Sequence, residues 1–427
     1  MLLFSWGKQV YGEWIVLTAL PAYLTLSDLG FASVAANEMT MQVARGERKA
    51  ALCVFQSTWV LISAASAAAM GCLVAVLPWL PLGAWLNLEQ IAATEAVEVI
   101  LLFALQVFLG LQIGLLCAGL RAVGEFALGV MYGNLGRVLE FILLAAIACG
   151  GGGPVLAAAA MLGGRAVTAG LSWRELRVRA PWIRWGWAEA RGTELRRLAR
   201  PAFAFMAFPL GHALNIQGIV IVISAMVSAP AAAAFSTMRT LSRLVVQLTT
   251  MVITSTWPEV SAAYGAGDME LARRLHRACC RVALWLVLPA VLVLGLFGGR
   301  LYACWVRGDL QFNATVFRLL LAVTLANVLW FASSVVPMAV NRHQGLAVLY
   351  LLGSGAALGL AVGLVPWLGL AGAALGLLAV DSAMIPYVLR KSLGLLDERF
   401  GGFMRSVIRL PQPRELLTLV PGSRLRS

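Results

Sequence analysis

Residues 98–120 read EVILLFALQVFLGLQIGLLCAGL and contain a single charged side chain, Glu98. A helix of about 20 such residues crosses the roughly 30 Å hydrocarbon core of a bilayer. In that core every backbone N–H and C=O must be hydrogen-bonded internally, which a helix achieves. The stretch therefore predicts a membrane-spanning helix.

Comparable stretches recur along nearly all of the 427 residues. Hydrophobic residues make up 60% of the chain and charged residues 12%, and the mean hydropathy is +0.84. Soluble domains carry about 25% charged residues. We predict an all-α polytopic membrane protein with about eleven transmembrane helices and no soluble domain of ordinary size. The predicted spans are 11–36, 52–79, 98–120, 126–149, 153–172, 201–228, 232–257, 281–304, 315–339, 345–367 and 369–389.

A long basic stretch divides these spans into five and six. We predict an amino-terminal helical bundle at 1–172, a basic cytoplasmic linker at 173–200, a carboxy-terminal bundle at 201–394 and a basic cytoplasmic tail at 395–427. In the linker, PWIRWGW (181–187) lies among arginines, a pattern typical of an interfacial helix on anionic lipid headgroups. The basic residues lie between apolar stretches and form no continuous basic face, so we expect no nucleic-acid partner.

The distribution of Lys and Arg predicts the orientation, because short loops rich in these residues stay in the cytoplasm. If the loop after the first span is cytoplasmic, that side receives 25 of the 33 basic residues and the opposite side four. The carboxy terminus is therefore predicted to be cytoplasmic and the amino terminus to be outside.

The start of the chain leaves the predicted helix count uneven. Residues 1–10, MLLFSWGKQV, form too short an apolar run to span and lack the basic region of a signal peptide. Transporters with internal duplication carry matched halves, so we expect a first helix to be missing or reduced to these residues. Residues 44–64 and 265–286 resemble each other weakly, since each has a Gly, an acidic residue, a basic amphipathic stretch and an apolar span.

Arginines inside the predicted spans are the strongest functional signal, since each costs about 2.5–3.5 kcal/mol at the centre of a bilayer. Arg239, Arg243 and Gln247 recur at i, i+4 and i+8 and so share one helix face. Guanidinium groups match phosphate oxygens, which favours a cavity wall that binds a phosphate, a pyrophosphate or a sugar acid. The alternative is a structural ion pair with Glu140 or Asp28.

The fourth span adds a second polar face with Asn134, Arg137 and Glu140. Arg137 could bind an anion together with Asn134, or it could pair with Glu140 on the same helix. Arg165, near the inner end of the fifth span, is expected to extend to the membrane surface.

Three carboxylates in apolar surroundings are candidates for proton or ion coupling, because such groups can be protonated and can relay protons. They are Asp28, Asp381 and Glu140.

Enzyme signatures are missing, and we predict no catalytic residues, no metal and no cofactor. GGGG (150–153) precedes Pro154 and indicates a turn, because a phosphate-binding loop requires GxxxxGK[ST]. No GxSxG or HExxH motif occurs, and the seven cysteines form no CxxC pair that would indicate zinc.

Several segments resemble one family. YGEW (11–14), LPAYLTLSDLGFASVAANEM (20–39) and ARGER (44–48) resemble the Wzx-type O-antigen and polysaccharide flippases of the MOP (MATE-like) superfamily. The second half of the chain agrees, through RTLSRLVVQL (239–248), STWPEVSAAYGAGDMELARRLHR (255–277) and GLAGAALGLLAVD (369–381). The resemblance implies two helical bundles in a V around a central cationic cavity, with one helix before the YGEW segment that this sequence lacks.

The resemblance also implies a function. The cargo would be an undecaprenyl-pyrophosphate-linked oligosaccharide, moved from the cytoplasmic to the periplasmic leaflet of the bacterial inner membrane for O-antigen, capsule or exopolysaccharide assembly. The headgroup would be bound by Arg239, Arg243, Gln247, Arg137 and Asn134. A polysaccharide polymerase, a chain-length regulator and anionic membrane lipids would be partners, and an ion gradient would drive transport through Asp28 or Asp381.

Two other functions remain open. A MATE-like drug or metabolite antiporter would favour an acidic, aromatic cavity, whereas four arginines lie well inside the predicted spans, away from their ends. A membrane polymerase or ligase of polysaccharide assembly would carry a long periplasmic loop, and the predicted outward loops are short.

Overall fold

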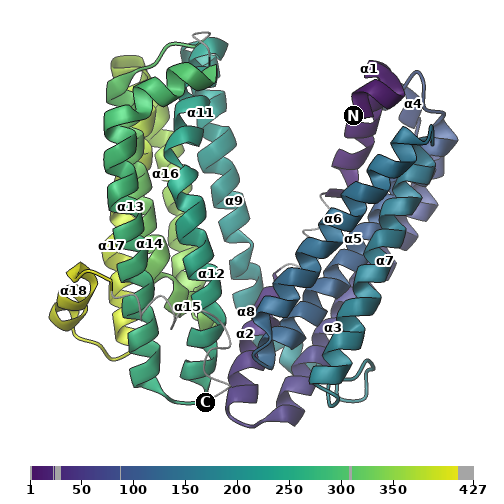
Figure 1. The fold of residues 1–427 in the computed structure, drawn as a ribbon, viewed down its shortest axis with the longest axis horizontal. Coiled ribbons are helices and arrows are strands. Elements are labelled where there is room, and N and C mark those ends of the chain that lie inside the picture. Colours follow the sequence, from purple (N-terminus) through teal and green to yellow (C-terminus); the bar gives the residue numbers. More distant parts are fainter. Residues whose placement is uncertain (1, 23, 25–29, 87, 307–309, 412–427) are drawn as a thin grey trace. The chain divides into compact units, whose positions relative to one another are not determined.

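The computed structural model describes residues 2–22, 24, 30–86, 88–306 and 310–411, and every regular element in these ranges is helical (Figure 1). The chain divides into two compact units, Met1–Ala199 and Arg200–Ser427. Nine helical segments of the described ranges are long and apolar enough to cross a membrane. Each unit is described by itself.

The amino-terminal unit is built around one central helix, α5 (Ala93–Ala122), which packs against all five other long helices of the unit. Trp14 contacts Phe103 of α5 edge-to-face at a centroid distance of 5.2 Å, and both side chains belong to the buried core. The other long helices are α1 (Leu2–Ala22), α2 (Phe31–Ala44), α3 (Arg48–Val76), α6 (Phe126–Cys149) and α7 (Pro154–Arg179), with the short η2 (Leu77–Trp79) and α4 (Leu82–Trp85) after α3.

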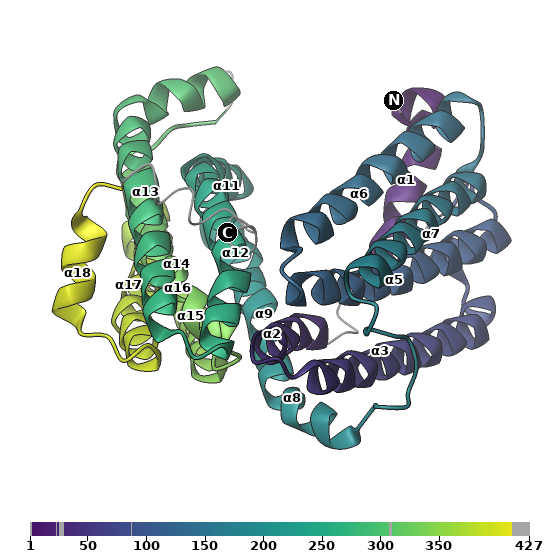
Figure 2. The same cartoon turned by 60° about the horizontal axis from the view of Figure 1, so that its bottom comes forward.

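The carboxy-terminal unit continues from α8 (Gly192–Phe205), which extends across the boundary between the units (Figure 2). Its long helices pack as neighbours, with α17 (Leu370–Leu395) against α14 (Ala314–Ser333) and α16 (Gln344–Leu368). The remaining elements are α9 (Ala207–Ala213), η3 (Leu214–Gly218), α10 (Ile219–Met226), α11 (Ala229–Ser242), α12 (Leu244–Gly265), α13 (Met269–Val306), α15 (Val335–Ala339) and α18 (Phe400–Ile408).

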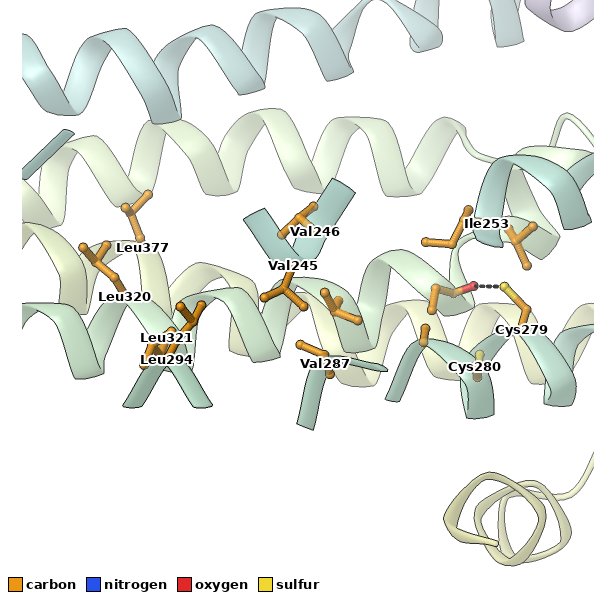
Figure 3. Packing of buried hydrophobic residues seen from close by; sticks show 14 of the residues in the cluster. Val245, Val246, Ile253, Cys279, Cys280, Val287, Leu294, Leu320, Leu321 and Leu377 are labelled. Atoms are coloured by element: carbon orange, nitrogen blue, oxygen red, sulfur yellow. Dashed lines mark hydrogen bonds between the residues drawn. The ribbon is translucent and has the colours of Figure 1, made fainter. Parts of the chain in front are cut away.

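Aliphatic side chains join these helices into one core (Figure 3). Val245 of α12, Leu321 of α14 and Leu377 of α17 are all at most 6% exposed. Lipid is as apolar as these side chains, so hydrophobicity alone does not hold the helices together. Close packing between the side chains does. The packing fixes α12, α14 and α17 around the polar cavity described below.

The first predicted span is not a single helix. In the described residues α1 begins at Leu2, earlier than the predicted start near Tyr11, and α2 begins after Gly30, whose φ of +80° is left-handed.

The acidic residue of YGEW has a local role: the Glu13 carboxylate accepts hydrogen bonds from the backbone N–H groups of Glu89, Gln90 and Ile91 at 2.8–3.3 Å. This carboxylate fixes the loop before α5.

The prediction of one helix over 232–257 is also wrong. The segment is interrupted at Arg243, which ends α11 and precedes α12. There the backbone N–H of Val246 bonds to the carbonyl of Arg243, three residues earlier, at 3.0 Å. A local tightening of the backbone thus replaces the regular helical bond pattern.

The predicted interfacial helix at 181–187 does not form. The α7 helix ends at Arg179, and residues 181–191 form an irregular loop packed on α3. The Gln56 side chain donates to the carbonyl of Arg184 at 3.0 Å and accepts from the N–H of Glu189 at 2.8 Å. Trp185 packs among three aromatic rings, those of Phe55, Trp59 and Trp173.

The weak internal resemblance has a structural counterpart. Gly46 precedes α3 and Gly267 precedes α13, and their φ angles are +82° and +78°. Glycine adopts this left-handed conformation without the penalty that a Cβ atom brings. Each half of the chain therefore uses the same kind of turn before its basic helix start.

Candidate functional site

The amino-terminal unit contains a cavity of about 380 Å³ between α2, α5 and α6. Arg121, Arg137, Asn134 and Ser33 supply its polar groups, and none of its described lining residues is acidic. Small residues keep it open, because a Cβ atom added at Gly133 would meet nothing within 4 Å. The cavity thus combines two guanidinium groups with neutral hydrogen-bonding side chains.

Arg121 was not among the predicted site residues. Its Nη2 donates to Oδ1 of Asn37 at 2.7 Å, and Asn37 is fully buried. The sequence places Arg121 just past the predicted end of a span, where a basic residue is expected for topology alone. The helix continues to Ala122, so Arg121 faces the cavity from the last turn of α5.

Arg137 does not pair with Glu140. The partner of Glu140 is Arg165 of α7, with Nε and Oε1 2.8 Å apart. The expectation that Arg165 extends to the membrane surface is therefore wrong, because α6 and α7 lie side by side and bring it to Glu140. Glu140 is 7% exposed and engaged in this pair, whereas Arg137 and Asn134 line the cavity.

The carboxy-terminal unit contains a smaller polar cavity of about 30 Å³, lined by residues that include Arg239, Arg243, Asp381 and Tyr350. Arg239 is 8% exposed and donates to the carbonyls of Asn215 and Ile216 at 2.9 and 3.1 Å. These carbonyls belong to the π-helical turn η3. A π-turn breaks the regular helical bond pattern, so Arg239 stabilises this turn as well as lining the cavity.

Asp381 lies across this cavity from α11. Its Oδ1 accepts from Trp330 Nε1 at 2.7 Å and from Asn327 Nδ2 at 3.1 Å. Arg243 attracts this carboxylate electrostatically but makes no hydrogen bond or close ion pair with any residue that the structure describes. The lining of the cavity thus includes both an Arg and an Asp.

The other predicted site residues lie elsewhere. Gln247 is exposed on α12 and lines neither cavity, because the break at Arg243 interrupts the expected helix face. Asp28 lies outside the described residues. Within the described ranges, no group of three or more His, Cys, Asp or Glu side chains could hold a metal ion.

Comparison with solved structures decides the architecture. A crystal structure of a MATE mutant aligns with a TM-score of 0.74 over 93% of this chain and 92% of that chain, at 17% sequence identity. An outward-facing multidrug resistance MATE family transporter of the MOP superfamily aligns with a TM-score of 0.72, over 93% and 92% of the two chains, also at 17% identity. The chain has a MATE-like fold.

A third solved structure also shares this fold. It is a MOP superfamily transporter from Pyrococcus furiosus for which a reversed polarity of the binding pocket suggests a different function. It aligns with a TM-score of 0.72 over 93% of this chain and 91% of that chain, at 17% identity. No family model and no curated protein matches the sequence. The predicted all-α polytopic membrane fold is therefore confirmed, and the flippase assignment stays a prediction.

Proposed function

We propose that this protein is a MOP-type transporter that moves an undecaprenyl-pyrophosphate-linked oligosaccharide across the bacterial inner membrane. One observation supports the proposal most: the amino-terminal cavity has two arginines and no acidic residue among its described lining residues. A pyrophosphate diester carries two negative charges, which Arg121 and Arg137 can balance. Asn134 and Ser33 are placed to add neutral hydrogen bonds to its oxygens.

The size of the two cavities separates their roles. The carboxy-terminal cavity is the smaller of the two, about 30 Å³, and an acidic residue, Asp381, is part of its lining. The amino-terminal cavity, about 380 Å³, has room for a pyrophosphate group. We therefore assign headgroup binding to Arg121, Arg137 and Asn134, and ion coupling to Asp381 beside Arg243.

The size and charge of these cavities also argue against drug antiport. An organic cation requires acidic and aromatic walls in a space of its own size. Among the described residues that line these two cavities only Asp381 is acidic; it lies in the smaller cavity, and the larger one is cationic.

The decisive experiment measures binding of undecaprenyl lipids to the purified protein. We expect the affinity to fall from pyrophosphate to monophosphate to the free alcohol, because each phosphate lost removes a charge-assisted contact. Arg137→Ala should weaken pyrophosphate binding about tenfold or more, the loss of one hydrogen bond to a charged group. Arg174→Ala, an exposed arginine of α7 outside the cavity, is the matched control and should bind as wild type.

A second variant tests the cavity without changing charge. Gly133→Leu fills the cavity, and Gly163→Leu places the same side chain on α7 in open space outside the cavity. A Cβ atom at either position would meet no atom within 4 Å, so both substitutions can be accommodated. In cells that depend on this protein for surface polysaccharide, Gly133→Leu should abolish polymer and Gly163→Leu should not. Wild-type polymer in both Gly133→Leu and Arg137→Ala, or equal binding of alcohol and pyrophosphate, would refute the proposal.

A further inference from the structure

A further cavity of the carboxy-terminal unit lies where α17 ends and α18 begins. It measures about 610 Å³, and Ile385, Leu389, Leu393 and Phe400 give it apolar walls. The α18 helix packs beside α13 (Figures 1 and 2). Arg281 of α13 holds α18 in place, donating from Nε to the carbonyl of Ser406 at 2.7 Å and from Nη2 to its Oγ at 2.6 Å. These bonds join α18 to α13.

One end of this groove is cationic. Arg390 lines the 610 Å³ cavity and also an adjoining cavity of about 480 Å³, where Lys391 and Tyr387 lie. Arg390 and Lys391 are exposed and form no ion pair with any part of the chain that the structure describes. Basic pockets at the ends of membrane helices are suited to lipid phosphate, so this end matches the headgroup of a phospholipid and the apolar walls match its acyl chain.

An acidic residue that lines the groove limits which lipid headgroup can bind. Glu398 also lines the groove, and its side chain is 3% exposed. Its Oε1 accepts from Arg277 Nε at 2.6 Å, whereas its buried Oε2 has no hydrogen-bond donor in the structure. A buried carboxylate oxygen without a donor is costly. Oε2 has almost no exposed surface, so a small rotation of the carboxylate is needed before a ligand N–H group can reach it and remove this cost.

We propose that the groove between α17 and α18 binds one phosphatidylethanolamine, whose headgroup carries both a phosphate and an ammonium group with N–H donors. Its phosphate contacts Arg390, its ammonium group donates to Glu398, and one acyl chain lies along Leu389 and Ile385 toward the bilayer interior. The site is separate from the proposed cargo site, so it stands or falls independently of the transported substrate.

Native mass spectrometry of the full-length protein, with two lipids in equal amount, tests the headgroup. Phosphatidylcholine has the same phosphate, but its methylated ammonium lacks N–H donors. We expect wild type to retain phosphatidylethanolamine about tenfold better, the effect of one hydrogen bond to a charged group. Glu398→Gln should reduce this preference while total phospholipid binding persists. Equal retention of both lipids by wild type would overturn the proposal.

Two further variants test the place of binding. Gly394 lines the groove, and a Cβ atom there would meet nothing within 4 Å, so Gly394→Trp should fill it and abolish retention. Gly402→Trp, on α18 outside the groove and equally open, is its control.

Arg390→Ala should lower lipid retention about tenfold, and Arg342→Ala, which changes another exposed arginine, is its control. Unfolding temperatures close to wild type establish folding, and full retention by folded Gly394→Trp would locate the lipid elsewhere.

Discussion

Four arginines lie well inside the predicted membrane spans, away from their ends, and their surroundings give them different roles. Arg165 is paired with Glu140, and Arg239 satisfies two backbone carbonyls. Arg137 and Arg243 face cavities with no hydrogen bond to the described residues. An arginine held by the protein contributes mainly to stability, whereas one that faces a cavity is available to a ligand.

This difference predicts that Arg239→Ala and Arg243→Ala affect the protein in different ways. Arg239→Ala leaves the carbonyls of Asn215 and Ile216 without their donor and should lower the free energy of unfolding by roughly 1–3 kcal/mol. Arg243→Ala should leave it near the wild-type value and impair transport. Thermal unfolding of both purified variants, beside a transport assay, checks this. If the two variants lost the same stability, the separate role of Arg239 would be wrong.

The sequence could identify the arginines but not their partners. Periodicity put Arg239 and Arg243 on one helix face and Asn134 and Arg137 on another, and each pair lines one cavity, because spacing along a helix determines which side chains share a face. It could not show that Glu140 prefers Arg165, since that contact depends on how α6 packs on α7. Arg121 was missed because a basic residue at a helix end already has a topological explanation.

At the scale of whole elements, the notable feature is where helices break. The π-turn η3 and the interruption at Arg243 both lie beside the small polar cavity. Mean hydropathy reports the average polarity of a segment. It therefore predicts the spans but cannot show where a helix inside a span is interrupted. A broken helix at membrane depth is tolerated where side chains satisfy the freed backbone groups, and Arg239 does so for η3.

The loop at 181–191 gives a prediction of the same kind. Its backbone is held by Gln56 through two hydrogen bonds, each with a net value of about 1 kcal/mol. Gln56→Ala should therefore make the loop open more often and speed trypsin cleavage after Arg184 or Arg191 by roughly tenfold or more. Mass spectrometry of timed digests measures the rate. Gln247→Ala, exposed on α12, is the control. An unchanged rate in Gln56→Ala would show that the loop is held by its aromatic contacts and by Ser57, whose Oγ accepts from the backbone N–H of Arg191 at 2.9 Å.

At the scale of the molecule, orientation and function depend on each other. The turn between α5 and α6, at 123–125, adjoins Arg121 and the amino-terminal cavity. The distribution of Lys and Arg predicts that this turn is cytoplasmic, together with the loop at 180–191 and the carboxy terminus. A lipid-linked sugar assembled on the cytoplasmic leaflet would then meet Arg121 and Arg137 on entry. The opposite orientation would present the same arginines to the periplasm and would be incompatible with export by this cavity.

Fusion of reporters tests this orientation directly. A reporter that is active only in the cytoplasm should work when fused after Ser427 or after Glu189, because each of these positions follows a strongly basic segment of the sequence. The same reporter should be inactive after Gly151, in the turn between α6 and α7 that contains no basic residue. A periplasmic reporter at the same three sites should give the reverse pattern. Cytoplasmic activity after Gly151, with none after Ser427, would invert the topology and remove the proposed route of cargo entry through Arg121 and Arg137.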